Sequence, residues 1–192
     1  MSKTKILFRS ANFIAASKPE GVSTYTSGPN DAGFKELLEE EYSERFFPVH
    51  RIDRETSGLV LYALNSKAAA ELSKLFESRQ VLKTYLAWVK GNPPERANLR
   101  APLPKKGGPP QSAETQMELI KRKNESGVDY ALLKVHPKTG RFHQIRRHFE
   151  MAGYPIVESP RLMLHAQKVE WLDPKTKRPI KIECAPPVTF WK

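Results

Sequence analysis

The amino-acid sequence predicts a single domain, residues 1–192, that combines β-strands and hairpins with a few short helices. A chain of 192 residues can bury a sizeable core, and 39% hydrophobic with 28% charged residues is ordinary for a globular protein. Strands are indicated by apolar or alternating runs between turn residues, and helices by apolar side chains at helical spacing. No internal repeat divides the chain, so one domain is the expectation.

The clearest element is a buried strand at residues 59–64, Leu-Val-Leu-Tyr-Ala-Leu. The polar segment and Thr-Ser-Gly turn before it, residues 50–58, predict a loop at the mouth of this strand. Asp53 lies in the loop between Arg51 and Arg54. Because nearby guanidinium groups favour the carboxylate form, we expect Asp53 to be ionised and able to act as a nucleophile or base. An ion-paired loop that only fixes the strand is the alternative.

The elements before this strand are short. Two β-type runs within residues 6–17 open the chain, and a Lys-Pro-Glu-Gly turn follows at residues 18–21. Apolar side chains then indicate a short acidic helix over residues 34–42, for which Asn30 or Asp31 can serve as N-cap.

A helix and a strand follow the buried strand. The helix is predicted over residues 66–77, because apolar side chains recur on its inner face and Asn65 or Ser66 can cap it. The strand is predicted over residues 81–90, because aromatic and branched residues alternate with polar ones before a glycine. Tyr85 in this strand is most simply a core or cross-strand residue.

Residues 92–111 are rich in proline, glycine and lysine, and should form an extended, mobile loop. Lys105 and Lys106 in this loop are candidates for phosphate contacts, although a solvated charge run has the same pattern. Two hairpins are expected after it, within residues 114–136 and 168–184, because alternating runs flank turn residues.

A third helix is predicted to start within residues 139–148 and to stop at Gly153. Its apolar stripe is expected to consist of Phe142, Ile145, Phe149 and Ala152. Helical spacing puts Arg146 at the edge of this stripe, where an unpaired charge is costly and a carboxylate partner is needed. Arg147 points away and can reach phosphate. Basic residues at a helix N-terminus suit an anion site, because free N–H groups point there.

The charge balance indicates a polyanionic partner. Thirty-two Lys and Arg residues against 21 Asp and Glu give a formal net charge of +11. Lys and Arg neutralise phosphates, so nucleic acid is the first candidate and a membrane surface the competing one. No apolar segment approaches the roughly 20 residues that span a bilayer, and no secretory apolar region follows the first residues. We therefore expect a cytoplasmic protein.

Several other chemistries lack their motifs. The single cysteine, Cys184, excludes an intramolecular disulfide and a zinc-thiolate cluster. The five histidines show neither HExxH nor zinc-finger spacing. No GxSxG elbow and no phosphate-binding P-loop is present. We expect no metal and no cofactor.

Three strings resemble the RluA-type RNA pseudouridine synthases. Residues 50–58, HRIDRETSG, resemble the family's HRLDxxTSG signature, and residues 83–85 resemble its KxY motif. Residues 139–148 resemble TGRxHQIRxH, with Phe142 in place of the more usual threonine. The resemblance covers about residues 18–186, and no room remains before it for the S4-type RNA-binding module of many relatives.

The resemblance implies an α+β fold, in which a long, mainly antiparallel mixed sheet flanked by helices carries a catalytic cleft across its middle. It implies that Asp53 is the nucleophile, that Tyr85 packs against the target base and that Arg146 pairs with Asp53. Arg51 would help to extrude the target nucleotide. The implied RNA-binding residues are Arg51, Arg54, Lys105, Lys106, Arg141, His143 and Arg147.

The implied partner is RNA, ribosomal or transfer, and the chain is expected to act as a monomer without metal, cofactor or membrane. A catalytically inert RNA-binding or ribosome-assembly factor of the same fold is the alternative. The chain departs from the family pattern at Glu158-Ser159-Pro160, which joins residues 154–157 directly to residues 161–166. The family's Gly-Asp and tyrosine-containing connection is missing there. We expect a tight connection or a break at this point, and with a tight connection a cleft more open on this side.

Overall fold

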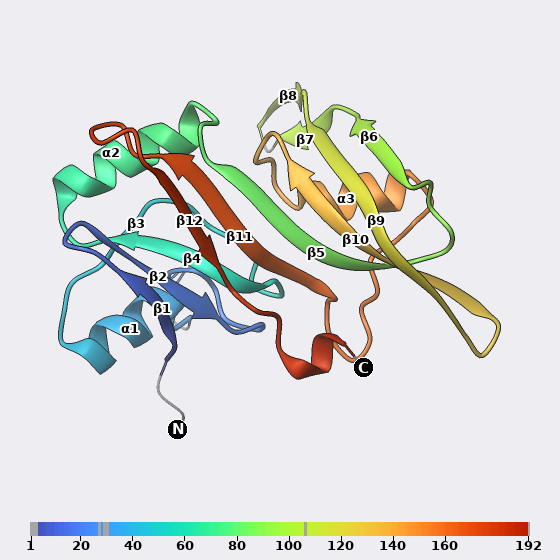
Figure 1. Cartoon of the computed structure of the whole chain (residues 1–192), viewed down its shortest axis with the longest axis horizontal. Coiled ribbons are helices and arrows are strands. Elements are labelled where there is room, and N and C mark those ends of the chain that lie inside the picture. The colour runs from blue at the N-terminus through green and yellow to red at the C-terminus, as the bar shows by residue number, and fades with distance from the viewer. Residues whose placement is uncertain (1–3, 27, 29–30, 106, 192) are drawn as a thin grey trace. The chain divides into compact units, whose positions relative to one another are not determined.

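The computed structural model describes residues 4–26, 28, 31–105 and 107–191, and the chain divides into two compact units (Figure 1). The first unit comprises Met1–Leu82 and Ala166–Lys192, and the second comprises Lys83–His165. Each unit combines antiparallel strands with helices, which agrees with the expected α+β class. Whether the two units act as one catalytic domain stays a prediction.

The first unit is built on strands in the order β1-β2-β4-β11, with β3 paired to β4 and β12 paired to β11. The pairs β1–β2, β2–β4, β3–β4 and β11–β12 are antiparallel. Its strands are β1 (Ile6–Arg9), β2 (Phe13–Lys18), β3 (Phe47–Pro48), β4 (Ser57–Ala63), β11 (Leu164–Leu172) and β12 (Pro179–Glu183). Its helices are α1 (Phe34–Tyr42), α2 (Ser66–Glu77) and the short 3-10 helix η1 (Val188–Phe190).

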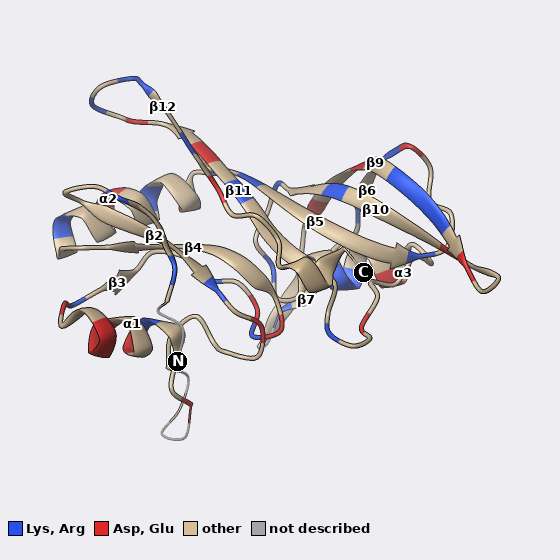
Figure 2. Cartoon of the chain, turned by 60° about the horizontal axis from the view of Figure 1, so that its bottom comes forward, with Lys and Arg blue, Asp and Glu red and all other residues tan. Residues whose placement is uncertain are grey.

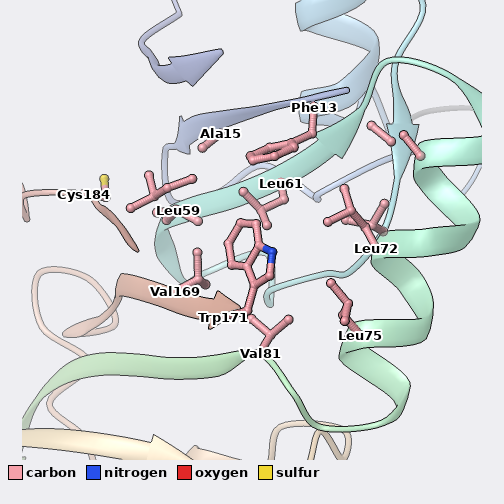
Figure 3. Close-up of a cluster of buried hydrophobic side chains, with 14 residues drawn as sticks. Phe13, Ala15, Leu59, Leu61, Leu72, Leu75, Val81, Val169, Trp171 and Cys184 are labelled. Carbon is pink, nitrogen blue, oxygen red and sulfur yellow. The ribbon is translucent and has the colours of Figure 1, made fainter. Parts of the chain in front are cut away.

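Strand β4 is the centre of the first unit, as its apolar run predicts. Every residue of β4 is buried. On one side Leu61 of β4 and Leu72 of α2 lie close to Trp171 of β11, whose ring centroid is 5.6 Å from that of Phe13 (Figure 3). The side chain of Asn65 accepts a hydrogen bond from the Ala68 amide and caps α2, as predicted. The loop before β4 is thus attached to a well-packed strand.

The second unit carries strands in the order β5-β10-β9-β6 and a separate β7-β8 hairpin. Its strands are β5 (Leu82–Lys90), β6 (Arg96–Arg100), β7 (Leu103–Lys105), β8 (Gly108–Gln111), β9 (Glu114–Glu125) and β10 (Val128–Pro137). Helix α3 (Gln144–Met151) contributes Ile145 and Phe149 to a core with Ala87 and Val89 of β5 and Leu133 of β10. The predicted hairpin of β9 and β10 is confirmed.

The expectation of an extended loop over residues 92–111 is wrong. This stretch holds β6, β7 and β8, and β6 pairs antiparallel with β9. Side chains of β6 alternate between exposed and half-buried, and Ala97 and Leu99 pack against the core of the second unit. β6 contains no proline, whereas Pro104, Pro109 and Pro110 lie in the two-stranded β7–β8 hairpin, and edge strands of this kind tolerate proline.

Helix α1 begins after Gly33, not after Asp31, and Asn30 lies outside the described residues. The Glu36 carboxylate accepts a hydrogen bond from the Thr26 amide at 2.9 Å and folds that loop onto Gly33. A Cβ at Gly33 would overlap both the Thr26 backbone and the Glu36 carboxylate. Only glycine therefore fits at position 33, the N-cap of α1.

Residues 158–160 form the tight connection that was one of the two expectations. The Met163 amide donates to the Val157 carbonyl at 2.8 Å, and the Val157 amide donates to the Trp88 carbonyl at 2.9 Å. Just before this connection, Ile156 makes an isolated antiparallel bridge with Val89 of β5.

Candidate active site

The loop that carries Asp53 joins β3 to β4 and is anchored at Ile52. The Ile52 side chain is 5% exposed, and the Ile52 amide and carbonyl both bond the Thr24 hydroxyl, at 3.2 and 2.9 Å. The Thr56 amide donates to the Asp53 carbonyl at 3.1 Å and closes a turn. Asp53 itself is half-buried. The loop is therefore anchored in the core through Ile52, while the next residue, Asp53, is only half-buried.

The buried ammonium of Lys18 is hydrogen-bonded to the backbone of this loop. Lys18 is 1% exposed and donates to the carbonyls of Pro19, Val22 and Arg54, at 2.8, 2.6 and 3.1 Å. The Arg54 carbonyl directly follows Asp53 in the chain. A buried charge is tolerated only with such hydrogen bonds, so the three carbonyls account for its position. Sequence reasoning treated Lys18 only as a turn residue.

Burial lowers the pKa of Lys18 to about 8, and the carboxylates of Glu55, Glu20 and Asp53 oppose part of this effect. Glu20 lies in the loop after β2, and Asp53 and Glu55 lie in the loop before β4. The same cation thus bonds the loop backbone and attracts the carboxylates of the loop.

The arginines beside Asp53 are both exposed. The Arg51 guanidinium lies over the Tyr25 ring, 5.7 Å from its centroid. The Nε of Arg54 donates to the Gly21 carbonyl at 2.9 Å. Both residues can present charge to phosphate while attached to the first unit. The structure thus brings Arg51, Asp53 and Arg54 together on one anchored loop.

His50 and Gly58 at the two ends of the string have structural tasks. The Nε2 of His50 accepts a hydrogen bond from the Leu61 amide at 2.9 Å, and its ring stacks on Phe76 with centroids 4.4 Å apart. Gly58 has φ +116°, and a Cβ there would lie 2.7 Å from the Ala166 backbone nitrogen. Only glycine fits this close approach of β4 to β11.

Two motifs far apart in the sequence are joined within the second unit. The ammonium of Lys83 in β5 donates to the Thr139 carbonyl at 3.4 Å, at the start of the string TGRFHQIRRH. Tyr85 of β5 is half-buried, lies opposite Val135 of β10 and packs against the core. This position fits a cross-strand tyrosine and also a residue with one side open to a ligand, so its catalytic role stays a prediction.

Arg146 of α3 is half-buried and has a carboxylate partner, as its position at the edge of the apolar stripe required. Its Nη2 lies 3.0 Å from a carboxylate oxygen of Glu158. Glu158 belongs to the tight connection that distinguishes this chain from the family pattern. Arg146 and Asp53 belong to different units, and their pairing stays a prediction.

The expected apolar stripe of α3 is wrong at Phe142. His143 adopts a left-handed conformation, with φ 51°, and the helix begins only at Gln144. Phe142 therefore lies outside the helical repeat and is 60% exposed. Ile145 and Phe149 are 7% and 0% exposed and form the buried stripe, as predicted.

The remaining predicted RNA-binding residues lie around the start of α3 or on β7. Arg141 is half-buried, and its Nε donates to the Ser112 carbonyl at 3.2 Å. The Arg147 guanidinium lies 5.3 Å from the centroid of the Phe142 ring. Lys105 is exposed at the end of β7, whereas Lys106 lies outside the described residues.

A buried hydrogen-bond network fixes the turn before α3. His148 Nε2 lies 3.3 Å from the Ala101 carbonyl, which can only accept, so Nε2 carries the proton. His148 Nδ1 then accepts from the Thr115 hydroxyl at 2.9 Å, and Thr115 accepts from the Gln144 amide group at 2.9 Å. Gln144 in turn accepts from the Thr139 hydroxyl at 2.6 Å. Burial lowers the pKa of His148 and keeps it neutral, as this network requires.

Among the described residues, no helix is long and apolar enough to cross a membrane. In the same part of the chain, His, Cys, Asp and Glu side chains form no group of three or more that could hold a metal ion. Basic and acidic residues are unevenly placed, with several acidic residues in α1 and a run of basic residues in β9 (Figure 2).

Comparison with known proteins assigns the family. Residues 12–151 match the family model described as RNA pseudouridylate synthase. The chain is 32% identical over 217 residues to the tRNA pseudouridine synthase C of Haemophilus ducreyi, a match that covers 92% of this chain and 88% of that protein. The corresponding protein of Vibrio cholerae is 30% identical over 93% of this chain and 89% of its own length.

A solved structure shows the same fold. Human RNA Pseudouridylate Synthase Domain Containing 1 superposes with a TM-score of 0.81 over 96% of this chain and 84% of that chain, at 23% identity. The match to the family model places the chain in a class of RNA-modifying enzymes. The chain belongs to the RNA pseudouridylate synthase family and has pseudouridine synthase activity. The expected RluA-type resemblance is confirmed, and the inert alternative is not supported.

The chain is shorter than these relatives within the matched region. The alignment with the Haemophilus ducreyi protein extends over 217 residues, although it contains only 92% of a 192-residue chain. That relative therefore has residues inside the region that this chain lacks.

Proposed function

We propose that this enzyme converts a uridine of transfer RNA to pseudouridine with Asp53 as the nucleophile. The observation that carries the proposal is the anchored loop, in which the half-buried Asp53 lies between the exposed Arg51 and Arg54. The two relatives described above carry the words tRNA pseudouridine synthase in their names, which favours transfer RNA over ribosomal RNA. The net charge of +11 supports binding to either polyanion.

The reaction is an isomerisation, so every atom of the uridine is retained except for exchanged protons. The Asp53 carboxylate attacks either the uracil ring or the ribose C1′, and the bond between N1 and C1′ breaks. The detached uracil rotates, and its C5 forms the new bond to C1′. C5 then loses its hydrogen as a proton, N1 gains a proton, and the carboxylate is released.

The target base must leave the RNA stack before this chemistry, at a cost of a few kcal/mol that favours loops and weakly paired sites. In our proposal Arg51 fills the vacated space, Tyr85 packs against the flipped base, and Arg146 holds Asp53 in its ionised form. The two compact units then act as one catalytic domain. We further expect a cytoplasmic monomer, and light scattering of the purified protein tests the second expectation.

The choice of RNA can be tested by the hydrogen that C5 loses. Transcripts of transfer and ribosomal RNA that carry tritium at C5 of uridine are incubated with the enzyme, and tritium released to water is counted. The proposal predicts release from transfer RNA and little from ribosomal RNA. Release only from ribosomal RNA would replace the proposed substrate and leave the reaction unchanged.

A further inference from the structure

Phe142 is an exposed aromatic residue whose ring contacts His143 and Arg147. It is 60% exposed, and the ring of the neighbouring His143 stacks on it with centroids 3.8 Å apart and an interplanar angle of 18°. The Arg147 guanidinium lies 5.3 Å from the centroid of the Phe142 ring. With both neighbours in place the residue is still 60% exposed, so part of the Phe142 side chain remains open to solvent.

The backbone at Phe142 is fixed on both sides. The Gln144 side-chain oxygen accepts from the Arg141 amide at 3.0 Å, and the Gln144 amide donates to the Arg141 carbonyl at 3.1 Å. Gln144 is 4% exposed and belongs to the network that ends at His148. Phe142 thus lies at the tip of a rigid turn, and a ligand that stacks on it meets a ring whose backbone is already ordered.

Packing within the protein does not explain Phe142. The buried stripe of α3 is formed by Ile145 and Phe149, which are 7% and 0% exposed. A single exposed phenylalanine is common and by itself indicates nothing. Here the ring is stacked in parallel with the His143 imidazole and lies beside the guanidinium group of Arg147, and guanidinium groups attract phosphates. An aromatic face among cations is the combination that binds single-stranded nucleic acid.

We propose that Phe142 is a stacking platform for an unpaired base of the bound RNA, with His143 beneath the ring and the arginines at the adjacent phosphates. The inference rests on the proposed function, because it assumes an RNA substrate, and it adds a base-binding position on the second unit. Stacking is tolerant of base identity, so the platform contributes affinity and orientation and leaves the choice of base to other contacts.

Affinity and its salt dependence test the platform. Wild type, Phe142→Ala, Phe142→Leu and Phe142→Tyr are titrated with a 12-nucleotide oligouridylate and with a matched oligomer that lacks the bases. Phe142→Ala should weaken binding of oligouridylate by about 5- to 150-fold, the range for one lost base stack. Phe142→Leu should lose as much, because it keeps apolar bulk but no aromatic face. Phe142→Tyr should retain wild-type affinity.

The abasic oligomer and the salt plot separate stacking from other roles. Wild type and Phe142→Ala should bind the abasic oligomer equally. The slope of log affinity against log salt should stay unchanged in Phe142→Ala and fall by about 0.7 in Arg147→Ala, which loses a phosphate contact. Phe8→Ala removes a 40% exposed phenylalanine of β1 and is the matched control with unchanged affinity.

Three results overturn the platform: affinity of Phe142→Ala within twofold of wild type, an equal loss for the abasic oligomer, or full affinity in Phe142→Leu. Tritium release from transfer RNA is measured for the wild type in the same series. A wild type that releases tritium from transfer RNA alongside any of these results refutes only the platform. If the wild type binds oligouridylate through Phe142 but releases no tritium from transfer RNA, the proposed substrate is refuted instead.

Discussion

The buried ammonium of Lys18 donates a hydrogen bond to the Arg54 carbonyl at 3.1 Å, one residue beyond Asp53. Two further carbonyls, of Pro19 and Val22, complete its hydrogen bonds. The start of the Lys-Pro-Glu-Gly turn and the loop before β4 are thereby held by one cation. From this arrangement we expect Lys18 to position the loop of Asp53, although it lies 35 residues earlier in the chain.

Lys18→Met should weaken both the fold and the reaction. The change keeps an apolar stem but leaves three carbonyls without their donor, so we expect a loss of about 1–3 kcal/mol in the free energy of unfolding. The displaced loop should lower kcat about tenfold or more, with a smaller effect on KM. Denaturant unfolding and single-turnover tritium release measure both. Lys67→Met, at an exposed position of α2, is the control, and an equally mild effect of both changes would contradict this role.

Gly58→Ala should destabilise the first unit severely. Gly58 has φ +116°, and the new Cβ would lie 2.7 Å from the Ala166 nitrogen. Backbone strain and the overlap together should cost about 3 kcal/mol or more. Gly127→Ala is the matched control, because Gly127 also has positive φ, +81°, but nothing lies within 4 Å of its Cβ position. Thermal unfolding should show a clearly larger loss for Gly58→Ala, and equal losses would contradict the close approach.

His148 should make the stability of the enzyme depend on pH. Burial lowers its pKa in the folded state below the ordinary value of 6.5, so the unfolded chain binds more protons than the folded one at mildly acidic pH. The stabilising contribution of neutral His148 is therefore fully present above pH 6.5 and is lost as the pH falls below that value.

Denaturant unfolding of wild type and His148→Gln between about pH 5 and 7.5 isolates this contribution, because the other histidines are common to both proteins. The free energy of unfolding should fall more steeply with acid in the wild type than in His148→Gln. Parallel curves would show that His148 does not titrate in this way.

Binding of transfer RNA should weaken steeply with salt. Each phosphate contact releases counterions and contributes about 0.7–0.9 to the slope of log affinity against log salt. Arg51→Ala should lower this slope by about one contact, because its guanidinium is exposed beside Asp53. Arg9→Ala should leave the slope unchanged, because Arg9 already pairs with Glu44 at 2.7 Å. A flat plot for the wild type would argue against phosphate-led recognition.

Local sequence patterns predicted the elements that depend mainly on local sequence, such as β4 and α2. Strand β4 and helix α2 are correct because a continuous apolar run and a capped amphipathic stretch each favour one element. Residues 92–111 were misread because proline and glycine indicate a loop, whereas pairing of β6 with the distant β9 decides the outcome. Phe142 was misread because one left-handed residue, His143, shifts the start of α3.

The anchors of the candidate site depend on tertiary contacts. A lysine beside a proline gives no sign that three carbonyls will enclose it, so the role of Lys18 was not predicted. The network from Ala101 to Gln144 joins three separate segments and has no pattern of its own. The strings HRIDRETSG and TGRFHQIRRH did indicate Asp53 and Arg146 as candidates, because they resemble the signatures of the family.

The reaction rate of the Asp53→Asn variant tests most directly whether Asp53 is the nucleophile. This change keeps the volume of the side chain and removes only the nucleophilic charge. Asp53→Asn should fold and bind transfer RNA nearly as the wild type does. Under single-turnover conditions it should release no tritium from uridine C5 above background. Retention of more than a few per cent of the wild-type rate would contradict the assignment of Asp53 as the nucleophile.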